Sequence, residues 1–141
     1  ITLDESPVRA ALNRDSSRLF IASQYSTDLQ VIDTRSNGIA GTIFTGGSAS
    51  SIIVDPKNDL VYMGKKTGEI VVIDPSSGMY IDSFPVPGDA AYMTIDGEEN
   101  MLLVLSSLRN EVHKFNLVSK RPQAKVATEK GAHALVVMGE L

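Results

Sequence analysis

The residues of this sequence whose types could do chemistry are first of all carboxylates. Asp33 and Asp74 stand 41 residues apart in the similar segments "VIDTRSNG" and "VIDPSSG", and paired carboxylates can serve as general acid and base. Each aspartate, however, opens a segment rich in turn residues, where an Asp side chain typically accepts hydrogen bonds from backbone N–H groups. We therefore expect Asp33 and Asp74 to stabilise turns.

Two further acidic segments, "DPKND" at 55–59 and "DGEEN" at 96–100, offer oxygen atoms of the kind that Ca²⁺ prefers. Neither has the ligand spacing of a calcium-binding loop. Because the chain contains no cysteine, thiolate metal sites, disulfides and cysteine nucleophiles are excluded. We expect solvated turns at both segments, and we predict no metal site and no cofactor.

The remaining candidates for catalysis are histidines and serines. His113 lies in "EVHKF" with no acidic partner at metal-ligand spacing, so we expect a half-exposed strand residue. The serine pairs at 76–77 and 106–107 lack the G-x-S-x-G signature of a hydrolase nucleophile and have no histidine in register. No catalytic residue is therefore predicted, and an enzyme is the less favoured interpretation.

Composition limits the classes of partner. The 141 residues carry a formal charge of −4, and the largest clusters of basic residues are the pairs at 65–66 and 120–121. A nucleic-acid-binding surface needs a denser group of Lys and Arg, so we expect no nucleic-acid partner. No uninterrupted apolar run is longer than that at 101–105, which is far shorter than the roughly 20 residues of a membrane-spanning helix. We therefore expect no membrane insertion.

An internal repeat indicates how these side chains are positioned. Three related segments follow one another at 10–47, 51–88 and 93–131. The matching positions Asp33, Asp74 and Asn116 are separated by 41 and 42 residues. A period of this length is typical of the four-stranded blade of a β-propeller.

Within each unit, short β-branched and aliphatic runs are bounded by turn residues, and no stretch sustains the i, i+3, i+4 pattern of an amphipathic helix. We therefore predict an all-β chain, a partial β-propeller with partial strands at both ends. Its three complete four-stranded antiparallel blades are expected at about 7–45, 48–86 and 89–130, within a single propeller segment that covers 1–141.

Both ends of the sequence continue the repeat pattern. We interpret residues 1–3 as the outer strand of a preceding blade and residues 132–138 as the innermost strand of a following blade. Three blades cannot close a ring, because propellers contain about four to eight. We expect ring closure by further blades of a longer chain or by homodimerisation, and we favour the longer chain because the partial strands lack their own middle strands.

These repeats resemble the YVTN-type (YncE-like) β-propeller repeat family. The resemblance rests on "SPVRAALNRDSSRLFIASQYSTDLQVID" at 6–33 and "SASSIIVDPKNDLVYMGKKTGEIVVID" at 48–74, with a drifted third copy ending in "EVHKFN". The proline that the family places at the start of each unit is present only as Pro7. The absence of tryptophan disfavours tryptophan-dependent propellers such as WD40 proteins.

The resemblance implies a prokaryotic protein that is periplasmic, secreted or on the cell surface. It also implies a non-catalytic binding or scaffold module for a protein or glycan partner. Some similar propellers are lyases or lactonases with a site at the mouth of the central channel, and others are subunits of redox enzymes. These alternatives stay open, because one fold hosts many activities.

Strand order predicts where a partner would bind. The loops between the second and third strands of each blade share one face with the links between blades, and propellers usually bind through such loops on a rigid scaffold. The binding candidates on this loop face are Tyr25, Asp28, Lys65, Lys66 and Arg109.

The starts of the innermost strands supply a second set of candidates. Arg9, Tyr92 and His133 occupy or neighbour matching positions there, and we expect them to form a polar lining at the mouth of the central channel. In the hairpins between second and third strands, Gly68 and Asn110 are expected to adopt positive φ, and so is Asp28 in the first unit.

Overall fold

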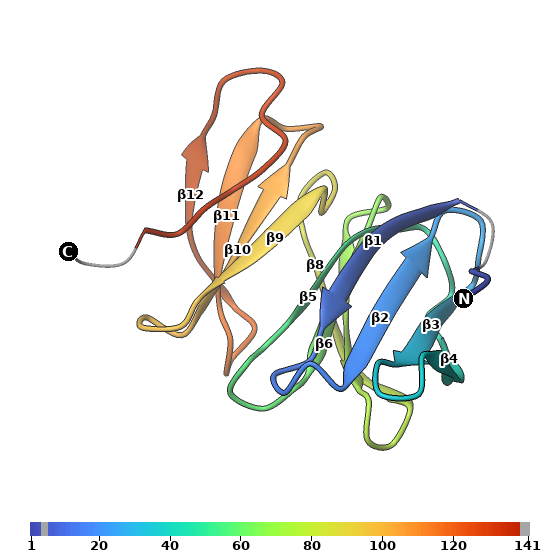
Figure 1. The fold of residues 1–141 in the computed structure, drawn as a ribbon. Coiled ribbons are helices and arrows are strands. Elements are labelled where there is room, and N and C mark those ends of the chain that lie inside the picture. Colours follow the sequence, from blue (N-terminus) through green and yellow to red (C-terminus); the bar gives the residue numbers. More distant parts are fainter. Residues whose placement is uncertain (4–5, 139–141) are drawn as a thin grey trace.

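The computed structural model describes residues 1–3 and 6–138, in which the strands form three four-stranded antiparallel sheets and no helix occurs (Figure 1). Blade A consists of β1 (Pro7–Leu12), β2 (Arg18–Ser23), β3 (Asp28–Asp33) and β4 (Gly38–Phe44). Blade B consists of β5 (Ala49–Val54), β6 (Val61–Lys65), β7 (Glu69–Asp74) and β8 (Met79–Pro85). Blade C consists of β9 (Tyr92–Asp96), β10 (Met101–Ser106), β11 (Glu111–Asn116) and β12 (Pro122–Ala127). The predicted all-β partial propeller with three complete blades is confirmed.

The middle blade has two buried faces. In β7, Val71 and Ile73 pack into the core shared with blade A, whereas Ile70 and Val72 pack into the core shared with blade C. Successive side chains of a strand point to opposite faces, so a strand that is covered on both sides needs apolar residues at consecutive positions. The run "IVVI" meets this requirement, and all four side chains are at most 2% exposed.

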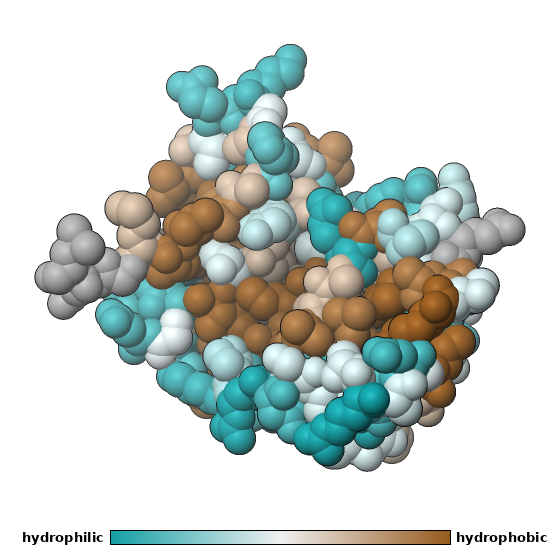
Figure 2. Space-filling view, in the orientation of Figure 1, coloured by the Kyte–Doolittle hydropathy of each residue, from teal (hydrophilic) through white to brown (hydrophobic). Residues whose placement is uncertain are grey.

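The innermost strands lie next to one another and the outermost strands lie at the rim. β5 contacts both β1 and β9, and these strands form the side of the molecule that faces the viewer in Figure 1. Figure 2 shows a band of apolar residues across the same region, with hydrophilic residues along its lower edge. At the rim, every residue of β12 is exposed.

The hairpins between the second and third strands confirm two of the three predicted positive-φ residues. Gly68 has a φ of 86° and Asn110 a φ of 52°. The prediction for Asp28 is wrong, because Asp28 begins β3 and its φ is not positive. The Ser26 hydroxyl holds this turn instead: Ser26 Oγ lies 3.1 Å from Asp28 N and 3.0 Å from Asp28 O.

The segments at the two ends are largely outside the sheets. Residues 1–3 are exposed, and residues 132–138 form no strand in the described part of the chain. Their assignment to neighbouring blades stays a prediction. Over residues 1–3 and 6–138, the chain has no helix with the length and apolar character that crossing a bilayer requires.

Candidate binding site at the channel mouth

One face of the molecule carries the loops that we expected to bind a partner. We call it the loop face; it is made of the hairpin loops at 24–27, 66–68 and 107–110 and the links at 45–48, 86–91 and 128–131. The same backbone hydrogen bond joins link to hairpin in each blade. The three bonds are Thr45 N to Thr27 O (2.9 Å), Val86 N to Gly68 O (2.8 Å) and Thr128 N to Asn110 O (2.8 Å). This repeated bond gives the loops a fixed base.

A cleft of about 420 Å³ opens on this face where the three blades meet. We call it the channel-mouth cleft. Its lining comes from all three blades: Val8, Arg9, Ala49, Ser50, Lys66, Asp89, Ala91, Ser107 and Leu108. The cleft therefore combines two cations, one carboxylate, two hydroxyls and an apolar floor.

Arg9 and Lys66 give the cleft its accessible charge. Both side chains are exposed, and they come from neighbouring blades. Arg9 Nη1 donates to the adjacent Val8 carbonyl at 2.8 Å, which leaves the other guanidinium donors free for a ligand. Lys66 is fixed by its backbone, since its N–H donates to Ser48 O at 2.9 Å. This pairing of one predicted channel-mouth residue with one predicted loop-face residue favours an anionic ligand group.

Asp89 is a residue of the cleft that the sequence did not single out. Its carboxylate accepts hydrogen bonds from Ser106 Oγ (2.9 Å) and Leu108 N (3.0 Å) through Oδ1 and from Ser107 Oγ (2.6 Å) through Oδ2. It is 7% exposed. Asp89 therefore fixes the hairpin that carries Leu108. The available signal was its departure from Ser6 and Ser48, which stand at the matching positions of the other blades.

Beneath the cleft, blades B and C are closely packed. Ser50 Oγ and Ser51 Oγ each donate to Ala90 O at 2.6 Å, which ties blade B to the start of blade C. Gly64 lies against the same group: a Cβ added there would stand 2.3 Å from Ser51 Oγ and 2.7 Å from Ala90 Cβ. The absence of a side chain at Gly64 lets the two blades approach.

The other loop-face candidates are distributed differently. Tyr25 is 75% exposed at its hairpin tip. The Lys65 side chain turns inward, is 12% exposed and forms an ion pair with Glu69 at 3.7 Å, so it is not available at the surface. Arg109 lies in a different hollow, between blades B and C, and Asp28 begins β3.

The structure does not bring the three predicted channel-mouth residues together around one cavity. Arg9 lines the cleft. Tyr92 is half-buried in β9, opposite Leu105 of β10. His133 is exposed, and its Nδ1 lies 3.4 Å from Gly131 O. Tyr92 and His133 do not line the channel-mouth cleft.

The repeated aspartates hold turns. Asp33 Oδ1 accepts hydrogen bonds from Arg35 N (2.8 Å) and Ser36 N (3.3 Å), and these bonds, aided by Arg18, lower the pKa of Asp33. Asp74 accepts from the hydroxyl and the N–H of Ser76 at 2.6 Å and 3.0 Å, and its pKa is lowered mainly by these bonds. A bond to the ionised form stabilises that form, which is why both values fall.

The acidic turns and His113 differ in part from expectation. Asp55 is 3% exposed and accepts from Lys57 N at 2.9 Å, so this carboxylate is a buried cap where we expected a solvated turn residue. His113 is 5% exposed rather than half-exposed, because it faces blade B. It also has an acidic neighbour, Glu111, on the same side of β11. Within the described residues, no group of three or more His, Cys, Asp or Glu side chains is arranged to hold a metal ion.

Comparison with known proteins identifies the fold. The chain superimposes on hydrazine synthase from Kuenenia stuttgartiensis with a TM-score of 0.84 and 17% identity, over 95% of this chain and 40% of that one. It also matches the WD40 repeats of RRP9 (TM-score 0.78, 14% identity, 90% of this chain and 40% of that one). For Sqt1 of Saccharomyces cerevisiae the TM-score is 0.77 at 19% identity, over 91% of this chain and 36% of that one.

The chain is a partial β-propeller. It spans about two fifths of the length of these solved propellers. No protein-family model matches the sequence, and no curated protein matches it. The similarity to WD40 proteins lies in the backbone, since this chain has no tryptophan.

Proposed function

We propose that this propeller segment is a non-catalytic interaction module that binds a protein partner at the channel-mouth cleft. The observation that carries the proposal is that Arg9 and Lys66, from neighbouring blades, line the same cleft. Leu108, which is 73% exposed, lines it as well. Cations beside an exposed apolar side chain, on loops with a rigid base, are typical of protein-binding surfaces. The partner segment we expect is acidic and carries an apolar side chain.

The family resemblance extends this proposal. We propose that the module is of the YVTN type and belongs to an exported or cell-surface protein. Its ring would be completed by further blades or by a second copy, and the share of each solved propeller that the chain covers supports a partial ring. Light scattering over a concentration series separates the two routes, because homodimerisation predicts a stable mass of twice 15.1 kDa.

The test of the binding proposal uses labelled peptides. Fluorescence anisotropy should show binding of a peptide of alternating Glu and Gly around one Leu, and no binding of the same peptide with Lys in place of Glu. The double change Arg9→Glu and Lys66→Glu should weaken binding at least about tenfold, because it places like charges at the contact.

The matched control is Arg14→Glu with Lys57→Glu, which makes the same charge change on loops of the opposite face. Both residues are exposed. Equal weakening by the two double variants would point to non-specific attraction and would refute the cleft as the site. Equal binding of the acidic and basic peptides would do the same.

A further inference from the structure

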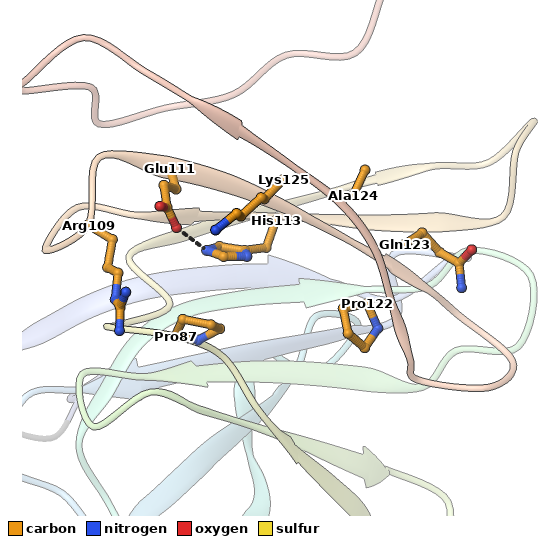
Figure 3. Close-up of a pocket in the computed structure, with 8 residues that line it drawn as sticks. All are labelled: Pro87, Arg109, Glu111, His113, Pro122, Gln123, Ala124 and Lys125. Carbon is orange, nitrogen blue, oxygen red and sulfur yellow. Dashed lines mark ion pairs between the residues drawn. The ribbon is translucent and has the colours of Figure 1, made fainter.

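A second space opens at the rim of the molecule, between blades B and C and away from the channel mouth. Two hollows of about 440 Å³ and about 500 Å³ share Pro87, Arg109, His113 and Pro122 as walls. We call this space the rim groove. Figure 3 shows the side chains of Arg109, Glu111, His113 and Lys125 around it, with Pro87 and Pro122 opposite.

The groove exists because blade C has a short side chain at the position where blade B has a long one. In the junction between blades A and B, that long side chain fills the equivalent space. Lys65, the last residue of β6, extends toward Gly46 of blade A, where its Nζ would stand 3.3 Å from an added Cβ. The last residue of β10 is Ser106, which is short and bonds to Asp89 instead. The volume that Lys65 occupies at one junction is thus open at the other.

His113 forms part of the wall of this space. Its Nε2 lies 3.0 Å from Glu111 Oε2, yet the alignment is not that of a hydrogen bond, and the buried atom has no hydrogen-bond partner among the described residues. Buried polar atoms in folded proteins are nearly always satisfied. The carboxylate of Glu111 is therefore the polar group that this nitrogen faces, and the imidazole ring supplies a buried wall of the groove.

The free charge of the groove is positive. Within the described part of the chain, neither Arg109 nor Lys125 makes an ion pair. Glu111 is the one carboxylate that lines the two hollows, against three cations, and the third cation, Lys120, is held by Tyr62 Oη at 2.9 Å and by Leu117 O. The two cations that remain available select an anionic group.

The remaining walls are flat and apolar. Pro87 and Pro122 line both hollows, and Phe115 lines one of them. Phe115 is fixed by a tilted contact with Phe84 across the junction, with ring centroids 5.2 Å apart. Such surfaces favour a planar apolar body rather than a fully hydrated ion.

We propose that the rim groove binds a small carboxylate whose body is an apolar ring. The carboxylate lies between Arg109 and Lys125, beside the buried His113 ring, and the apolar ring of the ligand lies against Pro87 and Pro122. This proposal is independent of the binding function assigned to the channel-mouth cleft, which uses other residues.

The experiment is an NMR titration of the chain with phenylacetate, with phenylacetamide as the uncharged analogue. The chain has two histidines, so the His113 ring resonance is assigned by difference from a His133→Gln variant. We expect a saturable shift of the His113 signal with a Kd on the order of 1 mM, as is reasonable for so small a ligand. Phenylacetamide should bind at least about fivefold more weakly.

The variants Arg109→Gln and Lys125→Gln should each weaken phenylacetate binding at least about fivefold, because each removes one partner of the carboxylate. Both side chains are exposed, so the fold should tolerate the changes, and a thermal unfolding curve verifies this. Lys114→Gln is the matched control, since Lys114 lies on the other face of β11 and pairs with Glu99. It should leave the affinity unchanged.

Three results would overturn the proposal. They are equal affinity for the acid and the amide, unchanged affinity in both groove variants, and no saturable shift up to roughly 20 mM, well above the expected range. The double variant Arg9→Glu and Lys66→Glu should bind phenylacetate normally. A failure at the groove is therefore separable from a failure at the channel mouth.

Discussion

Blade B packs against a neighbour on each side, and the two junctions differ most at their outer ends. Toward blade A, Val71 lies within an apolar core, and Lys65 and Glu69 form an ion pair beside it. Toward blade C, the position of Val71 is taken by His113, and the rim groove is open. β4 contacts β8, whereas β8 makes no comparable contact with β12 in the described residues.

The repeat determines the backbone pairing at both junctions, whereas individual side chains determine whether a junction is filled or open. The backbone pairing is the same: Val71 stands opposite Met63 and Ser83, and His113 opposite Val104 and Lys125. The change from a filled junction to an open one follows from a few side chains on this common frame. Such a site can arise at one junction without disturbing the fold.

The largest expected effect on stability comes from placing a histidine, the residue type at position 113, in the filled junction between blades A and B. Val71→His should lower the free energy of unfolding by about 4 kcal/mol, because it adds volume to a packed core and buries polar atoms without partners. Val71 is 2% exposed. Urea unfolding monitored by circular dichroism measures the loss.

The reciprocal substitution places a valine in the open junction between blades B and C. His113→Val should leave stability within about 1 kcal/mol of the parent, since it removes a buried nitrogen that has no hydrogen-bond partner. Comparable losses in the two variants would mean that the junctions are equally packed, which would contradict the comparison.

A second prediction concerns the inner end of the junction between blades B and C, which is closed. Gly64→Ala should cost about 2–3 kcal/mol of unfolding free energy, because the new Cβ would stand 2.7 Å from Ala90 Cβ and 2.8 Å from Ala90 O. Gly41→Ala is the control, since nothing lies within 4 Å of a Cβ there. A thermal midpoint as high in Gly64→Ala as in Gly41→Ala would show that the inner end is loosely packed.

The sequence predicted the strands that form both junctions but not the side-chain contacts within them. The repeat spacing gave the blades and the face that carries Arg9 and Lys66, because turn residues and apolar runs act locally. It did not separate Lys65 from Lys66, although one side chain is paired inside and the other is exposed. The role of Asp89 and the presence of the rim groove depend on contacts between side chains of different blades, and no single repeat unit encodes these contacts.

A smaller effect is expected at the hairpin that borders the channel-mouth cleft. Asp89→Ala should lower the free energy of unfolding by about 1–2 kcal/mol, because Ser106 Oγ and Leu108 N lose their acceptor. Asp89→Asn keeps one carbonyl oxygen and should lose less. Hydrogen exchange at the Leu108 amide should quicken in Asp89→Ala more than in Asp89→Asn; equal protection in both would refute the role of the carboxylate in holding this loop.

The smallest expected effect is on how stability depends on pH, because blades A and B cap a turn with an aspartate where blade C has an asparagine. The folded-state pKa of Asp74 lies below its ordinary value of 3.8, so its stabilising contribution is present above that value and is lost as the pH falls through the lowered pKa. In blade C the matching turn is capped by Asn116, whose Oδ1 accepts from Val118 N at 2.8 Å and does not titrate. Asp74→Asn should therefore keep the turn and reduce the drop in thermal midpoint between about pH 5 and pH 3, whereas Asn116→Asp should enlarge it. If both variants showed the acid dependence of the parent, the turn carboxylates would not be the source of that dependence.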